Sequence, residues 1–158
     1  GPGMLALTRG WAAGDQLVLR LEMAPRVTFA DPRIDAIRQD VALERGPLVY
    51  AVEDADLPAG MSVESLEVDP TMEVRAVTGP VPRIGEATRL AFEAQVRDEP
   101  GDAGWPFVSH AAGAITDRPA ARTTVAIRAV PYFAWAERPG LGMRVWMPTR
   151  RRSTDKER

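Results

Sequence analysis

Few residues of the chain stand in a spacing that suits catalysis. Ser109 and His110 pair a nucleophile with a base, but neighbours on an extended chain point to opposite sides. We therefore expect no triad there, and we expect His110 to hydrogen-bond within its own loop. The segment Gly140-Leu141-Gly142 lacks the rest of a dinucleotide-binding fingerprint. The sequence assigns no catalytic, cofactor-binding or metal-binding residue.

The densest acidic group is Glu53, Asp54 and Asp56, directly after a predicted strand. We interpret this group as a solvated turn. A calcium site is the alternative, because Ca²⁺ takes several oxygen ligands from one loop. Glycoside hydrolysis needs two carboxylates across a scissile bond, and none of the 22 acidic residues stands out as such a pair.

Composition excludes several other classes of site. The chain has 158 residues, no cysteine and one histidine. It can therefore hold no disulfide, thiolate zinc site, iron–sulfur cluster or cysteine nucleophile. The net charge of −2 does not suggest a nucleic-acid partner. There is neither an apolar run of about 18 residues for a membrane span nor a signal-peptide pattern, so the compartment stays open, with the cytoplasm favoured.

Aromatic residues are few but clustered near the end of the chain. Tyr132, Phe133 and Trp135 follow Pro131, and Trp146 lies just beyond. Pro131 is expected to end a strand and to turn the next three aromatics out of the sheet. Two interpretations remain open. These rings pack in the core or against another domain, or they stack on sugar rings.

Alternating apolar residues and frequent prolines predict an all-β chain. Leu17, Leu19 and Leu21 share one strand face, and Met4 to Thr8 is expected to form a hairpin with that strand. Glu86 to Arg97 fits a helix or a strand, and we favour a strand because its neighbours are strands. The other expected strands are Val27 to Phe29, Val41 to Leu43, Leu48 to Val52, Glu64 to Asp69, Met72 to Val77, Thr123 to Val130 and Met143 to Met147.

This number of strands predicts an antiparallel β-sandwich of about nine to eleven strands, with jelly-roll-like connections as one option. Asp98 to Pro119 is expected to be a long loop. We assign residues 1–149 to the sandwich region. Residues 150–158 carry five basic and two acidic residues and are expected to form a disordered basic tail.

Three stretches together resemble one family. They are Trp11 to Met23 (W-x-x-GD-x-L-x-L-x-L-x-M), Val41 to Glu53 (VALERGPLVYAVE) and Val130 to Pro148 (VPYFAWAERPGLGMRVWMP). In this order they are similar to the C-terminal region of glycoside hydrolase family 127, the β-L-arabinofuranosidase family. The resemblance runs from Gly3 to Pro148. One departure is Glu137-Arg138-Pro139, where the family has Asn-Arg-Gly.

The resemblance implies an accessory domain of a bacterial enzyme. Members of the family have an (α/α)6 barrel followed by β-sandwich domains, and a zinc-bound cysteine and a glutamate in the barrel perform the chemistry. No catalytic position carries over, so this chain alone is expected to be neither an enzyme nor a cofactor-binding protein. The implied partner is the N-terminal catalytic barrel, with a homodimer or a glycan as further options.

Residues of the matching motifs are the candidates for contact with a partner. Arg45-Gly46-Pro47 is expected to form a kink or bulge from which Arg45 reaches a carboxylate or carbonyl at a domain boundary. The family has further strands ahead of Trp11, so an unpaired strand edge or an exposed apolar face is expected near it. The full set of candidate interface or sugar-stacking residues is Arg45, Tyr50, Tyr132, Phe133, Trp135, Arg138 and Trp146.

Overall fold

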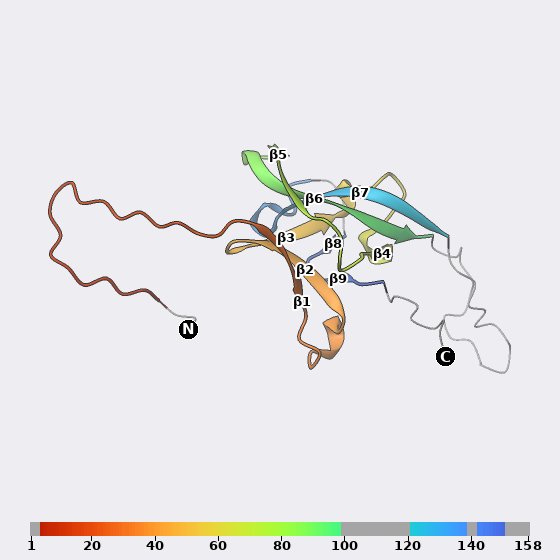
Figure 1. Ribbon diagram of the computed structural model, residues 1–158. Helices are drawn as coiled ribbons and strands as arrows, with labels where there is room; N and C mark the ends of the chain where they lie inside the picture. Colours follow the sequence, from red (N-terminus) through yellow and green to blue (C-terminus); the bar gives the residue numbers. More distant parts are fainter. Residues whose placement is uncertain (1–3, 99–120, 139–141, 151–158) are drawn as a thin grey trace.

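The computed structural model describes residues 4–98, 121–138 and 142–150. Within these residues the regular structure is almost entirely strand, and the helices are single 3-10 turns, which confirms the all-β prediction (Figure 1). The strands are β1 Pro25–Phe29, β2 Asp40–Arg45, β3 Leu48–Glu53, β4 Leu66–Glu67, β5 Arg75–Val81, β6 Gly85–Arg97, β7 Arg122–Pro131, β8 Met143–Arg144 and β9 Met147–Pro148. The 3-10 turns are η1 Asp35–Ile37, η2 Asp54–Asp56, η3 Val63–Ser65 and η5 Tyr132–Ala134.

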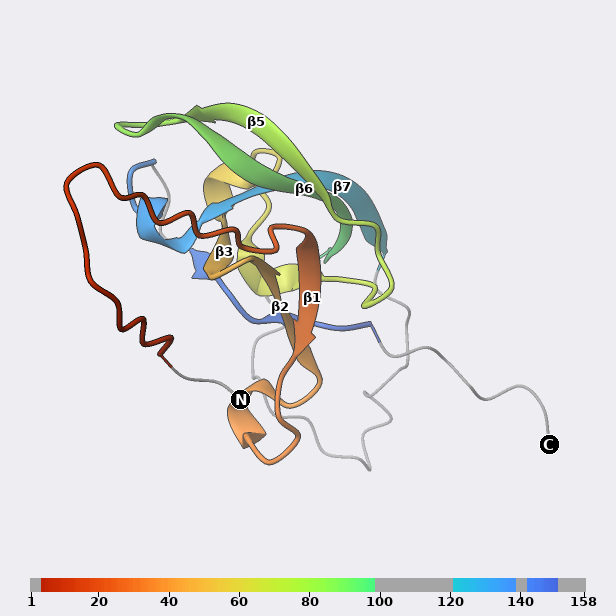
Figure 2. The same ribbon diagram turned by 60° about the vertical axis from the view of Figure 1, so that its left-hand side comes forward.

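All nine strands of the described residues belong to one hydrogen-bonded antiparallel sheet. Its order is β1-β2-β3-β7-β6-β4, with β5 on β6, β8 on β3 and β9 on β2. Figure 2 shows β5, β6 and β7 arching over β1, β2 and β3. The predicted division into two sandwiched sheets and the jelly-roll option are therefore not confirmed, because the ladder between β3 and β7 joins the two halves.

One apolar core lies between the two halves of the bent sheet. It takes residues from β2, β3, β4, β6, β7 and β9. Along β6, Leu90, Phe92, Ala94 and Val96 are all buried, whereas Glu93 between them is exposed. This period of two excludes the helical alternative for this segment, and the pairing of β6 with β5 and β7 confirms the strand.

Arg45-Gly46-Pro47 forms a hairpin turn and not the predicted kink or bulge. Arg45 pairs directly with Leu48, so Gly46 and Pro47 are the two central residues between β2 and β3. Gly46 has a φ of +56°. A glycine of positive φ at the first central position, followed by a residue fixed at negative φ, suits a two-residue hairpin turn. The turn thus sets the register of β2 against β3.

The predicted N-terminal hairpin is wrong. Residues 4–24, here called the N-terminal arm, contain no strand and extend away from the sheet (Figure 1). The alternation of Leu17, Leu19 and Leu21 predicts a strand face, but the structure has no strand at these residues. A strand is stable only when it pairs with a neighbouring strand. In the described residues no strand pairs with the N-terminal arm. The three leucines stay exposed.

The remaining predicted strands differ from the observed strands mainly in their length. Glu64 to Asp69 begins with η3 and keeps only the two-residue strand β4, and Met143 to Met147 divides into β8 and β9. The predicted loop beyond Asp98, with Ser109 and His110, lies outside the described residues, as do residues 151–158 of the predicted tail. Arg150, assigned to that tail, still donates its backbone N–H to the carbonyl of Val68 at 2.9 Å.

Candidate functional site

An exposed group of aromatic side chains lies where β7 ends. Pro131 closes the strand, and η5 then carries Tyr132, Phe133 and, one residue beyond, Trp135 at exposed fractions of 45%, 64% and 41%. The buried Ala134 packs with Val81 and Val130 and attaches η5 to the sheet. We call Tyr132, Phe133 and Trp135 the aromatic corner. Its exposure matches the prediction that Pro131 turns these rings out of the sheet.

Two of the rings in the aromatic corner lie against each other. The centroids of Tyr132 and Trp135 are 6.2 Å apart with an interplanar angle of 26°. Part of each ring face is therefore turned toward the other ring. Phe133 has the largest exposed fraction of the three residues. The arrangement forms a compact apolar patch and not a row of free ring faces.

A buried ionic cluster fixes the chain immediately after the aromatic corner. Arg138 Nε donates to Glu53 Oε2 at 2.7 Å, and its Nη1 and Nη2 bind the two carboxylate oxygens of Asp56 at 2.6 and 2.8 Å. Nη2 of Arg138 also contacts Glu53. The side chains of Arg138, Glu53 and Asp56 are only 14%, 7% and 1% exposed. Arg138 was predicted as an interface residue, and here it joins the end of β3 to the segment after η5.

Arg89 completes the ionic cluster from β6. Its Nη2 lies 2.7 Å from Asp56 Oδ1, and its Nε donates to the carbonyl of Arg128 at 3.1 Å. Burial lowers the pKa of Arg89, and the charge of Asp56 opposes that shift. The pKa of Arg138 is raised, mainly by its hydrogen bonds to Asp56. We call Glu53, Asp56, Arg89 and Arg138 the acid–arginine cluster. Its two acids and two bases balance in formal charge.

The prediction of a solvated turn at Glu53, Asp54 and Asp56 is wrong. Glu53 accepts the backbone N–H of Ala136 at 2.8 Å, and Asp54 accepts those of Val63 and Gly142 at 2.9 and 2.7 Å. The backbone N–H of Glu53 is bound by Asp56 at 3.0 Å. These acids therefore hold loops together. Their carboxylate oxygens, which a calcium ion would need as ligands, accept hydrogen bonds from arginine side chains and backbone amides instead.

The remaining predicted contact residues lie in different places. Tyr50 is 1% exposed and donates its hydroxyl to the carbonyl of Thr88 at 3.1 Å, so its assignment to a contact surface is corrected to the core. Burial raises the pKa of Tyr50, and the nearby Arg45 partly opposes this. Nε of Arg45 is buried and has no hydrogen-bond partner among the described residues. Trp146 is half-buried between β8 and β9.

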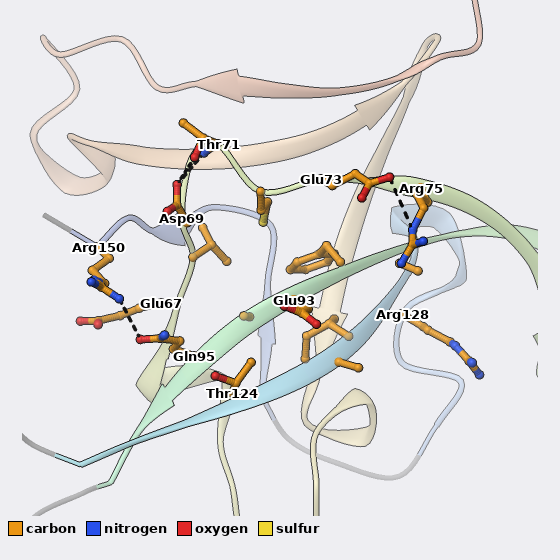
Figure 3. A pocket seen from close by; sticks show the side chains of 17 residues that line it. Glu67, Asp69, Thr71, Glu73, Arg75, Glu93, Gln95, Thr124, Arg128 and Arg150 are labelled. Atoms are coloured by element: carbon orange, nitrogen blue, oxygen red, sulfur yellow. Dashed lines mark hydrogen bonds and ion pairs between the residues drawn. The ribbon is translucent and has the colours of Figure 1, made fainter. Parts of the chain in front are cut away.

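A groove of about 630 Å³ crosses the outer face of β6 and β7, beside the chain that leads from β4 to β5. Figure 3 shows Glu93, Gln95, Thr124 and Arg128 along this face. The one aromatic residue in its lining is Phe92, which is 5% exposed. The groove thus has mixed polar chemistry without an exposed ring on which a sugar could stack.

A zinc-bound cysteine of the kind that the family resemblance implies does not fit this chain. The chain contains no cysteine. In the described part, no three His, Cys, Asp or Glu side chains converge as a metal-binding group. The described residues also contain no helix that is long and apolar enough to cross a membrane. The aromatic corner with its acid–arginine cluster is therefore the strongest candidate for a functional surface.

Comparison with known proteins identifies similar sequences and structures. Residues 25–148 match the glycoside hydrolase family 127 C-terminal domain. A non-reducing end beta-L-arabinofuranosidase from Bifidobacterium longum is 32% identical over 136 residues, which cover 85% of this chain and 20% of that protein. A solved glycoside hydrolase superposes with a TM-score of 0.67 at 25% identity, covering 82% of this chain and 20% of its own. A family 127 beta-L-arabinofuranosidase from Geobacillus stearothermophilus T6 gives a TM-score of 0.63 at 26% identity, covering 81% and 18%.

Proposed function

The chain belongs to the glycoside hydrolase family 127 C-terminal domain family, and we propose that it is a non-catalytic accessory domain of a β-L-arabinofuranosidase-like enzyme. It spans about a fifth of the length of the relatives that it matches. In this proposal the remaining four fifths contain the catalytic barrel. The accessory domain docks on that barrel through the aromatic corner, and the barrel performs the hydrolysis.

The observation that carries the proposal is an exposed aromatic patch beside a buried, hydrogen-bonded ionic cluster. Aromatic residues are enriched at protein interfaces, and a contiguous exposed apolar patch on a small domain commonly marks a contact site. The acid–arginine cluster fixes the segment behind the patch with buried charge-assisted bonds from Arg138. A pre-organised patch loses little conformational entropy on binding, which favours a permanent contact.

The burial of the carboxylates and the lack of a cysteine favour a structural role for this chain over a catalytic one. Its buried carboxylates Glu53 and Asp56 are held by arginines and backbone amides and are 7% and 1% exposed, so a substrate cannot reach them in this conformation. The resemblance assigns the nucleophile to a cysteine, which this chain lacks. Any metal that the enzyme uses is, in this proposal, bound outside this chain.

The test is a titration of the purified chain against the polypeptide that is encoded upstream in the same gene, here called the upstream region. We expect a 1:1 complex. Phe133→Ser should weaken it at least tenfold, because Phe133 is 64% exposed at the aromatic corner. Phe29→Ser is the matched control: Phe29 is 63% exposed but lies at the far end of β1. Its replacement should leave the affinity within about threefold.

Two other results would overturn the proposal. The first is that no upstream region encodes a barrel, or that the wild-type chain does not bind it. The second is that an arabinose-containing glycan binds the chain and changes the fluorescence of its tryptophans, with Phe133→Ser abolishing that change. The mutual contact of Tyr132 and Trp135 argues against this second result, because it covers part of the ring faces that a sugar would need.

A further inference from the structure

The N-terminal arm carries an unusual density of exposed apolar side chains. Within it, Leu17, Val18, Leu19 and Leu21 are 66%, 70%, 72% and 53% exposed, and Trp11 is 55% exposed. Isolated exposed leucines are ordinary on protein surfaces, but a run of them is not. In an isolated chain most of this surface contacts water, so its apolar character indicates a covering partner.

A preformed turn divides the arm into two legs. Asp15 Oδ2 accepts the backbone N–H of Ala12 at 3.0 Å and a guanidinium hydrogen of Arg9 at 2.7 Å. The N–H of Asp15 in turn donates to the carbonyl of Ala12 at 3.1 Å, and Gly14 adopts a φ of +91°. The Arg9 guanidinium lies 4.8 Å from the centroid of the Trp11 ring. The segment 9–15 is therefore structured although the legs around it have no partner strand.

The second leg, residues 16–22, has the pattern of a strand with one buried face. Leu17, Leu19 and Leu21 alternate with Val18 and Arg20. Seven extended residues span about 23 Å at the rise of a β-strand. The leg leaves the body at the β2–β3 turn, since a Cβ on Gly46 would lie 2.3 Å from the Sδ of Met23. Pro131 pairs with Tyr50 near the same end of β3, so the arm and the aromatic corner share one end of the molecule.

We propose that residues 16–22 add as a β-strand to an unpaired sheet edge in the upstream region, with the three leucines facing that sheet's core. This inference rests on the proposed function and names its second contact. Backbone hydrogen bonds to the edge strand supply the affinity, and the leucine face supplies the specificity. Val18 and Arg20 then face solvent.

A second copy of this chain is a poorer acceptor for the strand. Among the described residues, five strands pair with one neighbour only, and of these β4, β8 and β9 have just two residues each, too few for a seven-residue partner. The two longer ones are β1 and β5. β1 begins with Pro25, and β5 contains Pro80. Proline removes a backbone donor and disfavours edge-to-edge pairing. The acceptor edge is therefore expected outside this chain.

The test places the same residue, aspartate, on the two opposite faces of the proposed strand. Leu19 and Val18 are 72% and 70% exposed in the free chain, so aspartate at either position should leave its fold intact. We expect Leu19→Asp to weaken binding to the upstream region at least 30-fold and Val18→Asp less than threefold. Hydrogen–deuterium exchange of the wild-type complex should show at least tenfold slower exchange of amides in residues 16–22 than in the free chain.

The outcomes separate this inference from the proposed function. If the wild-type chain does not bind the upstream region at all, the proposed function fails. If it binds but Leu19→Asp is neutral, or both aspartate variants weaken binding equally, strand addition is wrong while docking stands. If the chain alone forms a dimer that Leu19→Asp dissociates, the partner is a second copy and the inference is overturned.

Discussion

Removing the guanidinium of Arg138 tests whether the acid–arginine cluster holds the aromatic corner in place. In Arg138→Met, a side chain of comparable length replaces one that makes four hydrogen bonds to Glu53 and Asp56. Glu53 keeps the N–H of Ala136, and Asp56 keeps Arg89. The cluster changes from formally neutral to a net charge of −1 in a buried place.

The size of the effect follows from this remaining imbalance. Removing one partner of a buried ion pair costs about 3–5 kcal/mol, because the other charge stays desolvated. Asp56 retains one arginine, so we expect the low end, about 3 kcal/mol of the free energy of unfolding. For a domain of this size that corresponds to a fall in Tm of about 6–12 °C. Glu53→Gln in the Arg138→Met background should restore part of the loss by removing the excess charge.

Urea denaturation followed by circular dichroism measures this difference. Arg33→Met is the control, since the Arg33–Asp31 pair is exposed and should have no measurable effect on the midpoint. A loss below about 1 kcal/mol for Arg138→Met would mean that the buried cluster does not hold this segment in place, as would an equal loss for Arg33→Met. The rings should respond as well: the near-ultraviolet signal of the tryptophans should weaken in Arg138→Met under native conditions.

Three further changes test the fold. Tyr50→Phe should cost about 1 kcal/mol at neutral pH through its lost hydrogen bond. Because burial raises the pKa of Tyr50, the wild-type protein should lose stability as pH rises above about 10 and through the folded-state pKa, and the phenylalanine variant should lack this loss in a urea titration against pH. Gly46→Ala should lower Tm more than Gly60→Ala. Both glycines have a positive φ, of +56° and +84°, but an added Cβ at Gly46 would meet Met23 of the arm, whereas Gly60 has open space around it. Leu90→Ala should cost about 2–5 kcal/mol by calorimetry, because Leu90 is fully buried.

The sequence was most informative where a segment finds its partners inside the chain. In β6 and β7 the alternation of apolar residues matches burial position by position, since both strands pair along their length. The outward turn of Tyr132 and Phe133 was predictable because proline ends a ladder. In the N-terminal arm the strand prediction is wrong because no partner strand is present: its leucines alternate, but no strand in the described residues pairs with them.

The acid–arginine cluster could not be predicted from local pattern. Glu53 and Asp56 look like a solvated turn because their partner Arg138 lies more than 80 residues away in sequence. The pairing of β3 with β7 on one side of Arg138 in sequence and with β8 on the other brings the two segments together. The one available signal was Arg138 itself, within the family motif, but its side chain points inward and not to a partner. Long-range ion pairs of this kind depend on topology, which composition and spacing do not encode.

The accessory role is tested most directly by measuring hydrolysis of an aryl β-L-arabinofuranoside by the upstream region, by this chain and by their mixture. We expect no hydrolysis by the chain alone. We also expect the upstream region to be more active, or to stay active longer at elevated temperature, when the chain is bound. Hydrolysis by the purified chain alone would show that the chain is not a non-catalytic accessory domain. An upstream region whose activity and thermal half-life are the same with and without the chain would contradict the accessory role as well.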